Sequence, residues 1–256
     1  MNTAASPVLE TRDLTIRFGG HVAVNAVSCA FAAGTLTAIV GPNGAGKTTY
    51  FNLISGQLPA SAGEVLLKGK SLLGMPPSAR TRAGLGRAFQ LTNLFPNLSV
   101  AENVRLAVQA RAGVGLDLWS VWSARSELKA KADAILERVA LAAKRDAVAA
   151  SLPHGDQRKL EVGMLLALEP EVFMFDEPTA GMSVDEVPVI LDLINAIKKQ
   201  KDKTILLVEH KMDVVRSLSD RIVVLHQGKL VADGLPAEVI NSDIVREAYL
   251  GGAADG

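Results

Sequence analysis

The feature that most constrains this chain is a glycine-rich stretch, residues 41–49, which reads GPNGAGKTT. Residues 36–40 before it are apolar enough for a buried strand, and the apolar spacing of residues 49–54 after it favours a helix. A strand, a G-x-x-x-x-G-K-[ST] loop and a helix in this order indicate a phosphate-binding loop. A chance glycine turn is disfavoured because every fixed position of the pattern is present.

Each part of this loop has a physical role toward a nucleoside triphosphate. Glycines let backbone N–H groups approach phosphate oxygens, and the start of the following helix adds positive dipole. Lys47 is expected to reach the β- and γ-phosphates, Thr48 to ligate Mg²⁺ and Thr49 to bond the α-phosphate. The predicted nucleotide-binding residues are Gly41, Pro42, Asn43, Gly44, Ala45, Gly46, Lys47, Thr48 and Thr49.

Composition limits the class of protein. The 27 lysine and arginine residues equal the 27 aspartate and glutamate residues, so no overall positive charge favours nucleic acid as a partner. The one cysteine, Cys29, excludes an internal disulfide and is expected to be a packed thiol. No signal peptide is apparent and no run of about 18 apolar residues exists, which predicts a cytoplasmic protein without a membrane span.

Apolar strands alternate with helical patterns along the chain, which predicts an α/β fold. We expect a P-loop NTPase core with a mostly parallel sheet, an N-terminal antiparallel β subdomain opened by a hairpin at residues 8–31, and an inserted α-helical subdomain. The expected organisation is one domain over residues 1–256. Its core lies at about 6–90 and 158–250, its helical subdomain at about 91–157 and a frayed tail at 251–256.

Polar residues close several predicted strands. Asp176 and Glu177 follow the apolar residues 172–175, at the end of a parallel strand where doubly wound sheets bind ligands. Asp176 is expected to hold Mg²⁺ opposite Thr48, and Glu177 to orient the attacking water. An acidic helix cap is the alternative for this pair, and the phosphate-binding loop argues against it.

Three further candidates come from other strand ends and turns. His210 closes a buried strand and is expected to contact the γ-phosphate. Gln90 closes another and is expected to sense Mg²⁺ and the attacking water. Phe18, before a double glycine, is a candidate for stacking on the nucleobase, with core packing as the alternative. Trp119 and Trp122 share a helix face that either anchors the core or binds a partner.

The order of these motifs resembles the ATP-binding subunit of an ABC transporter over about residues 8–250. The resemblance implies an ATPase that works as a head-to-tail dimer, with ATP held between the loop of one protomer and the signature segment of the other. It matches Phe18 to the adenine-stacking aromatic, Gln90 to the Q-loop and His210 to the switch histidine. Asp176 and Glu177 match the Walker B pair, and residues 180–183 fall where the D-loop begins.

The signature segment departs from that family's usual Leu-Ser-Gly-Gly-Gln, because residues 152–156 read LPHGD. Pro153 offers neither a hydroxyl nor a backbone N–H, and Asp156 brings a carboxylate toward phosphate oxygens. Gly155 and the helix start behind it remain, so Gly155 is the expected contact to the partner protomer's ATP. We hypothesise weaker ATP-driven dimerisation or slower turnover. Ser183 also replaces the common D-loop aspartate, which leaves that contact across the dimer open.

Several stretches look like those of branched-chain amino acid importers, namely residues 18–20, 86–91, 180–182, 247–251 and the tryptophan-bearing insert. Residues 154–155 and 160–164 resemble the related urea and short-chain amide importers. Implied partners are integral-membrane permease subunits, a second ATPase subunit that is either a copy or a paralogue, and, indirectly, a periplasmic or extracellular solute-binding protein. No nucleic acid is expected, and the implied location is the cytoplasmic face of the inner membrane.

Two other classes of protein are alternatives to a transporter ATPase. A soluble ABC ATPase of DNA repair or translation usually has long coiled coils or tandem cassettes, and this chain has one cassette without heptads. A regulatory module that binds ATP without hydrolysing it would suit the unusual signature. The presence of Lys47, Asp176, Glu177 and His210 argues against it.

Overall fold

The computed structural model describes residues 7–88, 94–113 and 126–242, and the chain divides into two compact units. The first unit contains Met1–Leu85, Glu171–Glu177 and Lys198–Gly256, and the second contains Gly86–Pro170 and Pro178–Ile197. Gln90, Trp119, Trp122 and the predicted frayed tail all lie outside the described residues. The single-domain organisation, with its core and subdomain limits, stays a prediction.

The first unit holds an antiparallel sheet with the strand order β2-β1-β4-β5. Its strands are β1 (Leu9–Phe18), β2 (His21–Phe31), β4 (Ala62–Leu67) and β5 (Lys70–Ser71). β1 and β2 pair antiparallel from Leu9 opposite Phe31 to Phe18 opposite His21, which confirms the predicted hairpin. Gly19 turns the chain between them with a φ of 58°.

A second sheet has the order β10-β9-β3-β8-β7-β6. Its strands are β3 (Leu36–Val40), β6 (Leu85–Ala88), β7 (Val172–Asp176), β8 (Thr204–Val208), β9 (Arg221–His226) and β10 (Lys229–Gly234). β3 pairs parallel with β8 and β9, and β7 pairs parallel with β8. Every residue of β3, β7 and β8 is buried, which is why these strands read as unbroken apolar runs.

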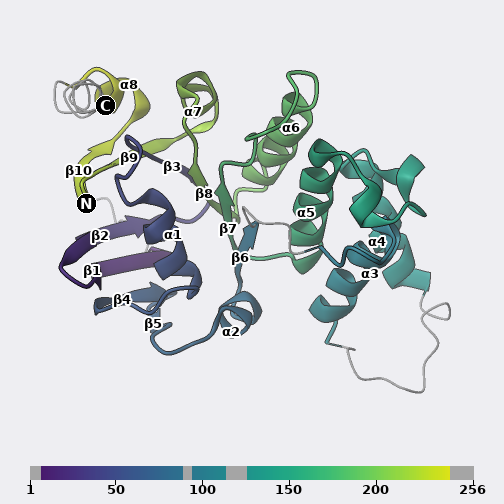
Figure 1. The fold of residues 1–256 in the computed structure, drawn as a ribbon, viewed down its shortest axis with the longest axis horizontal. Coiled ribbons are helices and arrows are strands. Elements are labelled where there is room, and N and C mark those ends of the chain that lie inside the picture. Colours follow the sequence, from purple (N-terminus) through teal and green to yellow (C-terminus); the bar gives the residue numbers. More distant parts are fainter. Residues whose placement is uncertain (1–6, 89–93, 114–125, 243–256) are drawn as a thin grey trace. The chain divides into compact units, whose positions relative to one another are not determined.

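Helix α1 (Lys47–Ser55) lies between the two sheets of the first unit (Figure 1). Its Tyr50 and Phe51 are fully buried in a core that includes Phe31 from the antiparallel sheet and Val208 from the parallel one. The Tyr50 hydroxyl has a partner in that core, the Thr11 hydroxyl at 2.7 Å. The helix that follows the glycine-rich loop is therefore fixed by apolar contacts on both sides.

The opposite face of the parallel sheet packs against α7 (Met212–Leu218) and α8 (Pro236–Ile240). Val215 and Val239 from these helices form a smaller core with Ile222 and Val224 of β9. The first unit thus covers its parallel strands on both faces, as the alternation of strands and helices predicts.

Cys29 in β2 is a buried free thiol, as expected from its apolar neighbours. Burial raises the pKa of this thiol to about 11, and the nearby Arg221 guanidinium opposes the shift only in part. A thiol that stays protonated near neutral pH is a poor nucleophile, so Cys29 is a packing residue.

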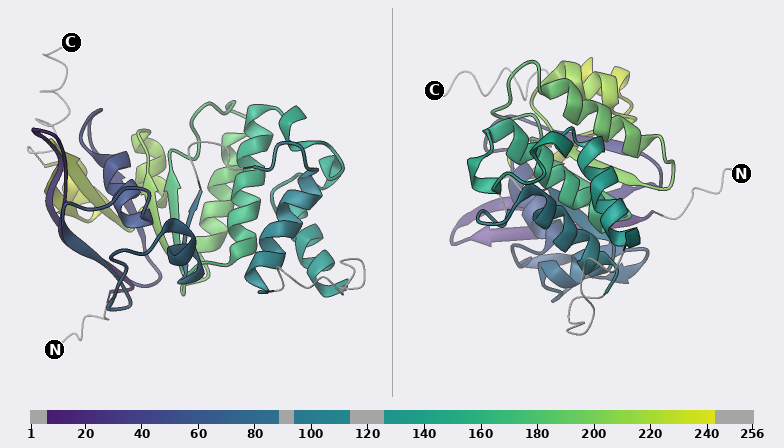
Figure 2. Two further views of the ribbon diagram at one scale, coloured as in Figure 1. Left: turned by 60° about the horizontal axis from the view of Figure 1, so that its bottom comes forward. Right: turned by 90° about the vertical axis from the view of Figure 1, so that its right-hand side faces the viewer.

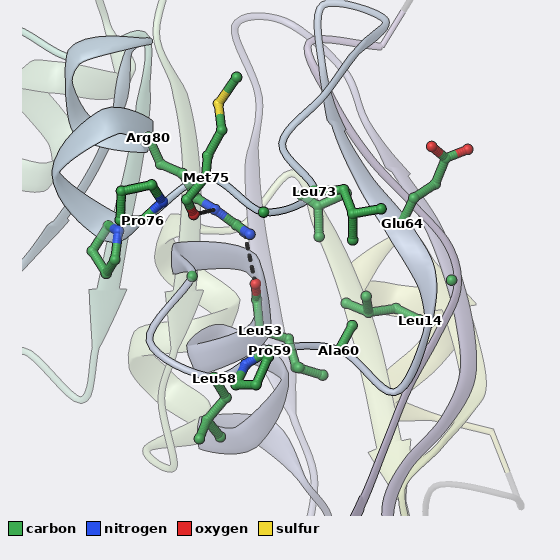
Figure 3. Close-up of a pocket in the computed structure, with 15 residues that line it drawn as sticks. Leu14, Leu53, Leu58, Pro59, Ala60, Glu64, Leu73, Met75, Pro76 and Arg80 are labelled. Atoms are coloured by element: carbon green, nitrogen blue, oxygen red, sulfur yellow. Dashed lines mark hydrogen bonds between the residues drawn. The ribbon is translucent and has the colours of Figure 1, made fainter.

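The far end of α1 is closed by Arg80 of α2 (Pro77–Arg82). The Arg80 guanidinium donates from Nη1 to the Leu53 carbonyl at 2.8 Å and from Nε to the Met75 carbonyl at 3.1 Å (Figure 3). Nη1 also donates to the Ile54 carbonyl at 2.7 Å. Two of these carbonyls belong to the last turn of α1, so the bonds place a cation at the negative end of that helix.

A mostly apolar cavity of about 480 Å³ lies beside this arginine, lined by residues such as Leu14, Leu58 and Leu73 (Figure 3). Its charged lining residues are Glu64 and Arg80.

The second unit is helical within the residues that the structure describes. α3 (Val100–Arg111), α4 (Ser126–Arg138) and α5 (His154–Leu168) pack on one another and lie side by side in Figures 1 and 2. The same unit contains α6 (Val187–Lys198) up to Ile197 and two short 3-10 turns, Ala142–Lys144 and Ala149–Ser151. α3 begins after Ser99, whose side chain accepts a hydrogen bond from the Glu102 N–H, a standard N-cap.

We predict that Arg80→Ala lowers the free energy of unfolding by about 3 kcal/mol, because it removes the hydrogen bonds of a buried guanidinium to three backbone carbonyls. Urea unfolding followed by circular dichroism measures this change. Arg82→Ala, on the same helix but exposed, is the matched control and should change the stability by less than about 0.5 kcal/mol. Equal effects of the two substitutions would show that Arg80 does not support α1.

Candidate functional site

The glycine-rich loop begins at the end of β3 and enters α1 at Gly46. Gly46 has a φ of 97°, and a Cβ built on it would lie 2.5 Å from the Ala23 carbonyl oxygen, so both backbone angle and space require glycine. The Ala45 carbonyl accepts a hydrogen bond of 3.0 Å from the Gly228 N–H. The loop is therefore held by backbone contacts to β2 and to the turn between β9 and β10.

Lys47, the first residue of α1, is 6% exposed and folds back over its own loop. Its ammonium donates to the carbonyls of Gly41 at 2.7 Å and Pro42 at 2.9 Å. An ammonium has three N–H groups, so one donor remains for an incoming phosphate. Burial lowers the pKa of Lys47, and the carboxylates of Glu177 and Asp176 work in the opposite direction.

Glu177 and His210 come together from two neighbouring strand ends. The Nε2 atom of His210 lies 2.7 Å from Oε1 of Glu177, a hydrogen bond whose direction depends on the imidazole tautomer. Glu177 directly follows β7, and His210 follows β8 with Glu209 between them. The two strands are parallel neighbours. The structure thus brings together the two residues that the sequence places at separate strand ends.

The backbone at Glu177 is strained. Its φ of 50° lies in the left-handed region, which costs a residue with a side chain on the order of 1 kcal/mol. The Glu177 N–H donates to the Val208 carbonyl at 2.9 Å, which fixes the peptide in this orientation. The turn directs the carboxylate of Glu177 to His210 and to the cavity over the loop.

A residue that the sequence reasoning missed, Glu209, holds the backbone at His210. Glu209 is 3% exposed, and its Oε2 accepts from the N–H groups of His210 at 2.7 Å and Lys211 at 3.4 Å. The sequence does carry a signal for Glu209, because it is an acidic residue that directly follows an apolar strand and precedes His210. A carboxylate in that place can only be buried if local donors satisfy it.

Lys47, Glu177 and His210 all line one cavity of about 270 Å³ in the first unit. It is lined by His21, Ala23, Asn43, Gly44, Ala45, Gly46, Lys47, Thr48, Thr49, Glu177 and His210. His21 is a second residue that the sequence reasoning did not single out. Phe18, at the end of β1, is 50% exposed, so it is not a core residue and its ring remains available to a ligand. Gln90 lies outside the described residues.

Asp176 ends β7 and is 2% exposed, and its carboxylate is near enough to Lys47 to oppose in part the lowering of the Lys47 pKa by burial. Among the described residues, no group of three or more histidine, cysteine, aspartate or glutamate side chains has the arrangement of a metal site. The oxygen atoms of Asp176 and Thr48 are nevertheless the donor type that Mg²⁺ prefers, and Mg²⁺ usually takes few protein ligands.

The signature segment lies in the second unit, where α5 starts at His154 directly after Pro153. Asp156 is not a bare carboxylate, because it is bonded to the ammonium of Lys144 and, at 2.9 Å, to that of Lys159. Burial by itself raises the pKa of Asp156, but the bonds from Lys144 and Lys159 outweigh it and hold that pKa below its ordinary value. The charge repulsion expected between Asp156 and phosphate is therefore largely neutralised within this segment.

Strand, glycine loop and helix, with an acidic strand end and a histidine at the same cavity, define a P-loop nucleotide-binding protein. A sequence model described as ABC transporter matches residues 24–180, and one described as branched-chain amino acid ATP-binding cassette transporter matches residues 229–255. The chain belongs to the ABC transporter family, as one of its ATP-hydrolysing subunits.

Curated relatives match almost the whole chain. The high-affinity branched-chain amino acid transport ATP-binding protein LivG of Escherichia coli is 37% identical over 254 residues, which cover 97% of this chain and 100% of that protein. The corresponding protein BraF of Pseudomonas aeruginosa is 37% identical over 96% of this chain and 99% of its own length.

Solved structures agree with this family. The ADP conformation of MJ1267, an ATP-binding cassette of an ABC transporter, has a TM-score of 0.80 at 28% identity and covers 95% of this chain and 98% of that one. The cbiO1 protein of Clostridium perfringens, part of the ABC transporter complex cbiONQ, has a TM-score of 0.77 at 27% identity over 96% and 95% of the two chains. The predicted α/β fold with a P-loop NTPase core is thereby confirmed.

No helix within the described part of the chain combines the length and the apolar character that crossing a bilayer demands.

We predict that Lys47→Ala weakens nucleotide binding about tenfold or more, because it removes the cation that faces the cavity. Titration with a fluorescent ATP analogue measures the dissociation constant. Lys70→Ala, an exposed lysine of β5, serves as the control and should leave that constant unchanged. Similar constants for the parent and Lys47→Ala would remove Lys47 from the binding site.

Proposed function

We propose that this chain hydrolyses ATP to power the uptake of branched-chain amino acids, or of related small polar solutes, through a separate membrane permease. The observation that carries the chemistry is the single cavity that gathers Lys47, Glu177 and His210 over the glycine loop. The solute class rests on the relatives, whose names give branched-chain amino acid transport as their task. It is supported by the match of residues 229–255 to a branched-chain amino acid transporter model.

In the proposed reaction Glu177 accepts a proton from the attacking water. The water oxygen forms a bond to the γ-phosphorus while the bond from that phosphorus to the β-phosphate oxygen breaks, and ADP leaves. His210 orients the Glu177 carboxylate through the 2.7 Å hydrogen bond and contacts the γ-phosphate. Lys47 and the N–H groups at the start of α1 stabilise the negative charge on the phosphates.

The remaining predicted residues position the substrate. Thr48 and Asp176 would hold Mg²⁺, which supplies charge neutralisation at the β- and γ-phosphates when bound. Phe18, half exposed at the end of the first hairpin, would stack on adenine. Gln90 would sense Mg²⁺ and the attacking water, and Gly155 would meet the ATP held by a second ATPase subunit.

The assembly follows from the same proposal. The chain would sit on the cytoplasmic face of the inner membrane, against permease subunits that contact the helical unit and the stretch around Gln90. A second ATPase subunit, a copy or a paralogue, completes each nucleotide site, and a periplasmic or extracellular solute-binding protein delivers the solute. A urea or short-chain amide importer is the alternative that residues 154–155 and 160–164 favour.

We expect Glu177→Gln to lower kcat for ATP hydrolysis at least about a hundredfold, because the amide cannot take the proton from water. The ATP dissociation constant should stay within about threefold of the parent value, since the loop is untouched. Phosphate release by the purified full chain with MgATP measures kcat. Glu238→Gln, exposed on α8, is the matched control. Hydrolysis by Glu177→Gln at the parent rate would overturn the assignment of the base.

Uptake measurements test the transported solute. Cells lacking this chain should lose high-affinity uptake of labelled leucine, isoleucine and valine and keep uptake of urea and acetamide. The parent chain should restore uptake, and Lys47→Ala should not, because the permease then lacks its source of energy. Loss of urea or amide uptake alone would establish the alternative importer. Unchanged uptake of every one of these solutes would contradict the importer assignment.

A further inference from the structure

Glu186 stands between two segments of the chain. One is the start of α5 with Gly155, which the proposed function places against the ATP of a second ATPase subunit, and the other is residues 180–183, which fall where the D-loop begins. Both belong to the second unit, so their contacts lie within one compact body. Glu186 itself is the residue directly before α6.

On one side the Glu186 carboxylate binds the end of the first segment. Its Oε2 accepts hydrogen bonds from the Ser183 N–H at 3.2 Å and the Ser183 hydroxyl at 2.9 Å. The Ser183 carbonyl in turn accepts from the N–H groups of Glu186 and Val187 at 3.1 and 3.2 Å. A glutamate that accepts from the N–H of a serine three residues before it forms one half of a capping box, and here the serine hydroxyl bonds to the same carboxylate. Ser183 is therefore fixed by Glu186.

On its other side the same carboxylate lies directly against Gly155 in the first turn of α5. A Cβ built on Gly155 would lie 2.2 Å from Oε1 and 2.3 Å from both Cδ and Oε2 of Glu186. Real Cβ atoms do not approach other atoms this closely, so this glycine is required by the carboxylate that faces it. The φ of Gly155 is not positive, so backbone freedom is not the reason for glycine here.

Two more contacts tie the same segments together. The ring of His154 faces Gly181, where a Cβ would lie 3.6 Å from the Nδ1 and Cε1 atoms. The ammonium of Lys159 lies 3.9 Å from Oε1 of Glu186 and 2.9 Å from Asp156. The carboxylates of Glu186 and Asp156 are thus balanced by Lys159 and Lys144, and the positive end of the α5 dipole favours them further.

We propose that Glu186 is a positioning residue for ATP hydrolysis, which holds residues 180–183 and the start of α5 in one fixed relation. The two segments then meet the partner's ATP together, and a displacement of either is transmitted to the other through the carboxylate. This inference rests on the proposed function, because it assumes that Gly155 faces ATP in trans. It also explains how Ser183 serves in place of the usual aspartate: its partner is Glu186 within the same protomer.

Steady-state hydrolysis by the purified full chain tests this proposal. Glu186→Ala should lower kcat about tenfold, while the ATP dissociation constant of the glycine loop, measured by analogue titration, stays at the parent value. Glu186→Gln keeps the shape and one carbonyl acceptor for Ser183, and it should retain most of kcat. Asp192→Ala, exposed on α6, is the control and should match the parent. Thermal unfolding of each variant shows whether the fold is intact.

A double-substitution cycle tests the contact to Gly155 by itself. Gly155→Ala should lower both the melting temperature and kcat, because the methyl group has no room beside Glu186. Adding Glu186→Ala should restore the melting temperature without restoring kcat. If Glu186→Ala does not fold, Glu186→Asp, whose carboxylate is withdrawn from Gly155, replaces it in both experiments.

Two results would overturn the proposal. One is parent-like kcat in Glu186→Ala, and the other is a cycle in which Gly155→Ala is equally harmful with and without Glu186. Both are distinct from failure of the proposed function, in which the parent chain and Glu177→Gln would hydrolyse ATP equally.

Discussion

The carbonyl oxygen of Ala23 stands where a side chain on Gly46 would have to be, and the nucleotide loop depends on that close approach. It brings the first hairpin against the start of α1, while the bond from Gly228 to Ala45 adds the turn after β9. Two backbone segments that are distant from the loop in sequence therefore fix it. Apolar packing of α1 between the two sheets and the Arg80 cap at its far end keep this helix in place.

The edge of the parallel sheet that carries Glu177 and His210 follows from the same framework. β7 and β8 are neighbours that end at the same edge, so Glu177 and His210 are delivered within hydrogen-bonding distance of each other. The strained φ of Glu177 and the buried carboxylate of Glu209 set the two backbones. Such strain persists only where surrounding structure enforces it, and here both flanking strands are fully buried.

The contacts within the second unit change how its unusual signature segment, residues 152–156, is interpreted. In the sequence alone, Asp156 is an unfavourable negative charge near phosphate, and Ser183 in place of the usual aspartate leaves the contact across the dimer open. In the structure Asp156 is paired with two lysines, and Ser183 is bonded to Glu186. The hypothesis of weak dimerisation or slow turnover therefore rests on Pro153, which still lacks both the hydroxyl and the N–H. That hypothesis stays a prediction.

The sequence by itself determined the fold class, the hairpin before the loop, the family and nearly all the candidate site residues. It could do so because a phosphate-binding loop and strand-end acids are local patterns, set by backbone geometry over a few residues. Only the tertiary structure decided which charges are paired and which residues support others. Glu209 and Glu186 are recognised by their contacts and His21 by its place in the cavity lining, and the partners of Asp156, Lys144 included, are not all close in sequence. Such contacts depend on how separate helices and strands pack, and no periodicity or spacing along the chain encodes them.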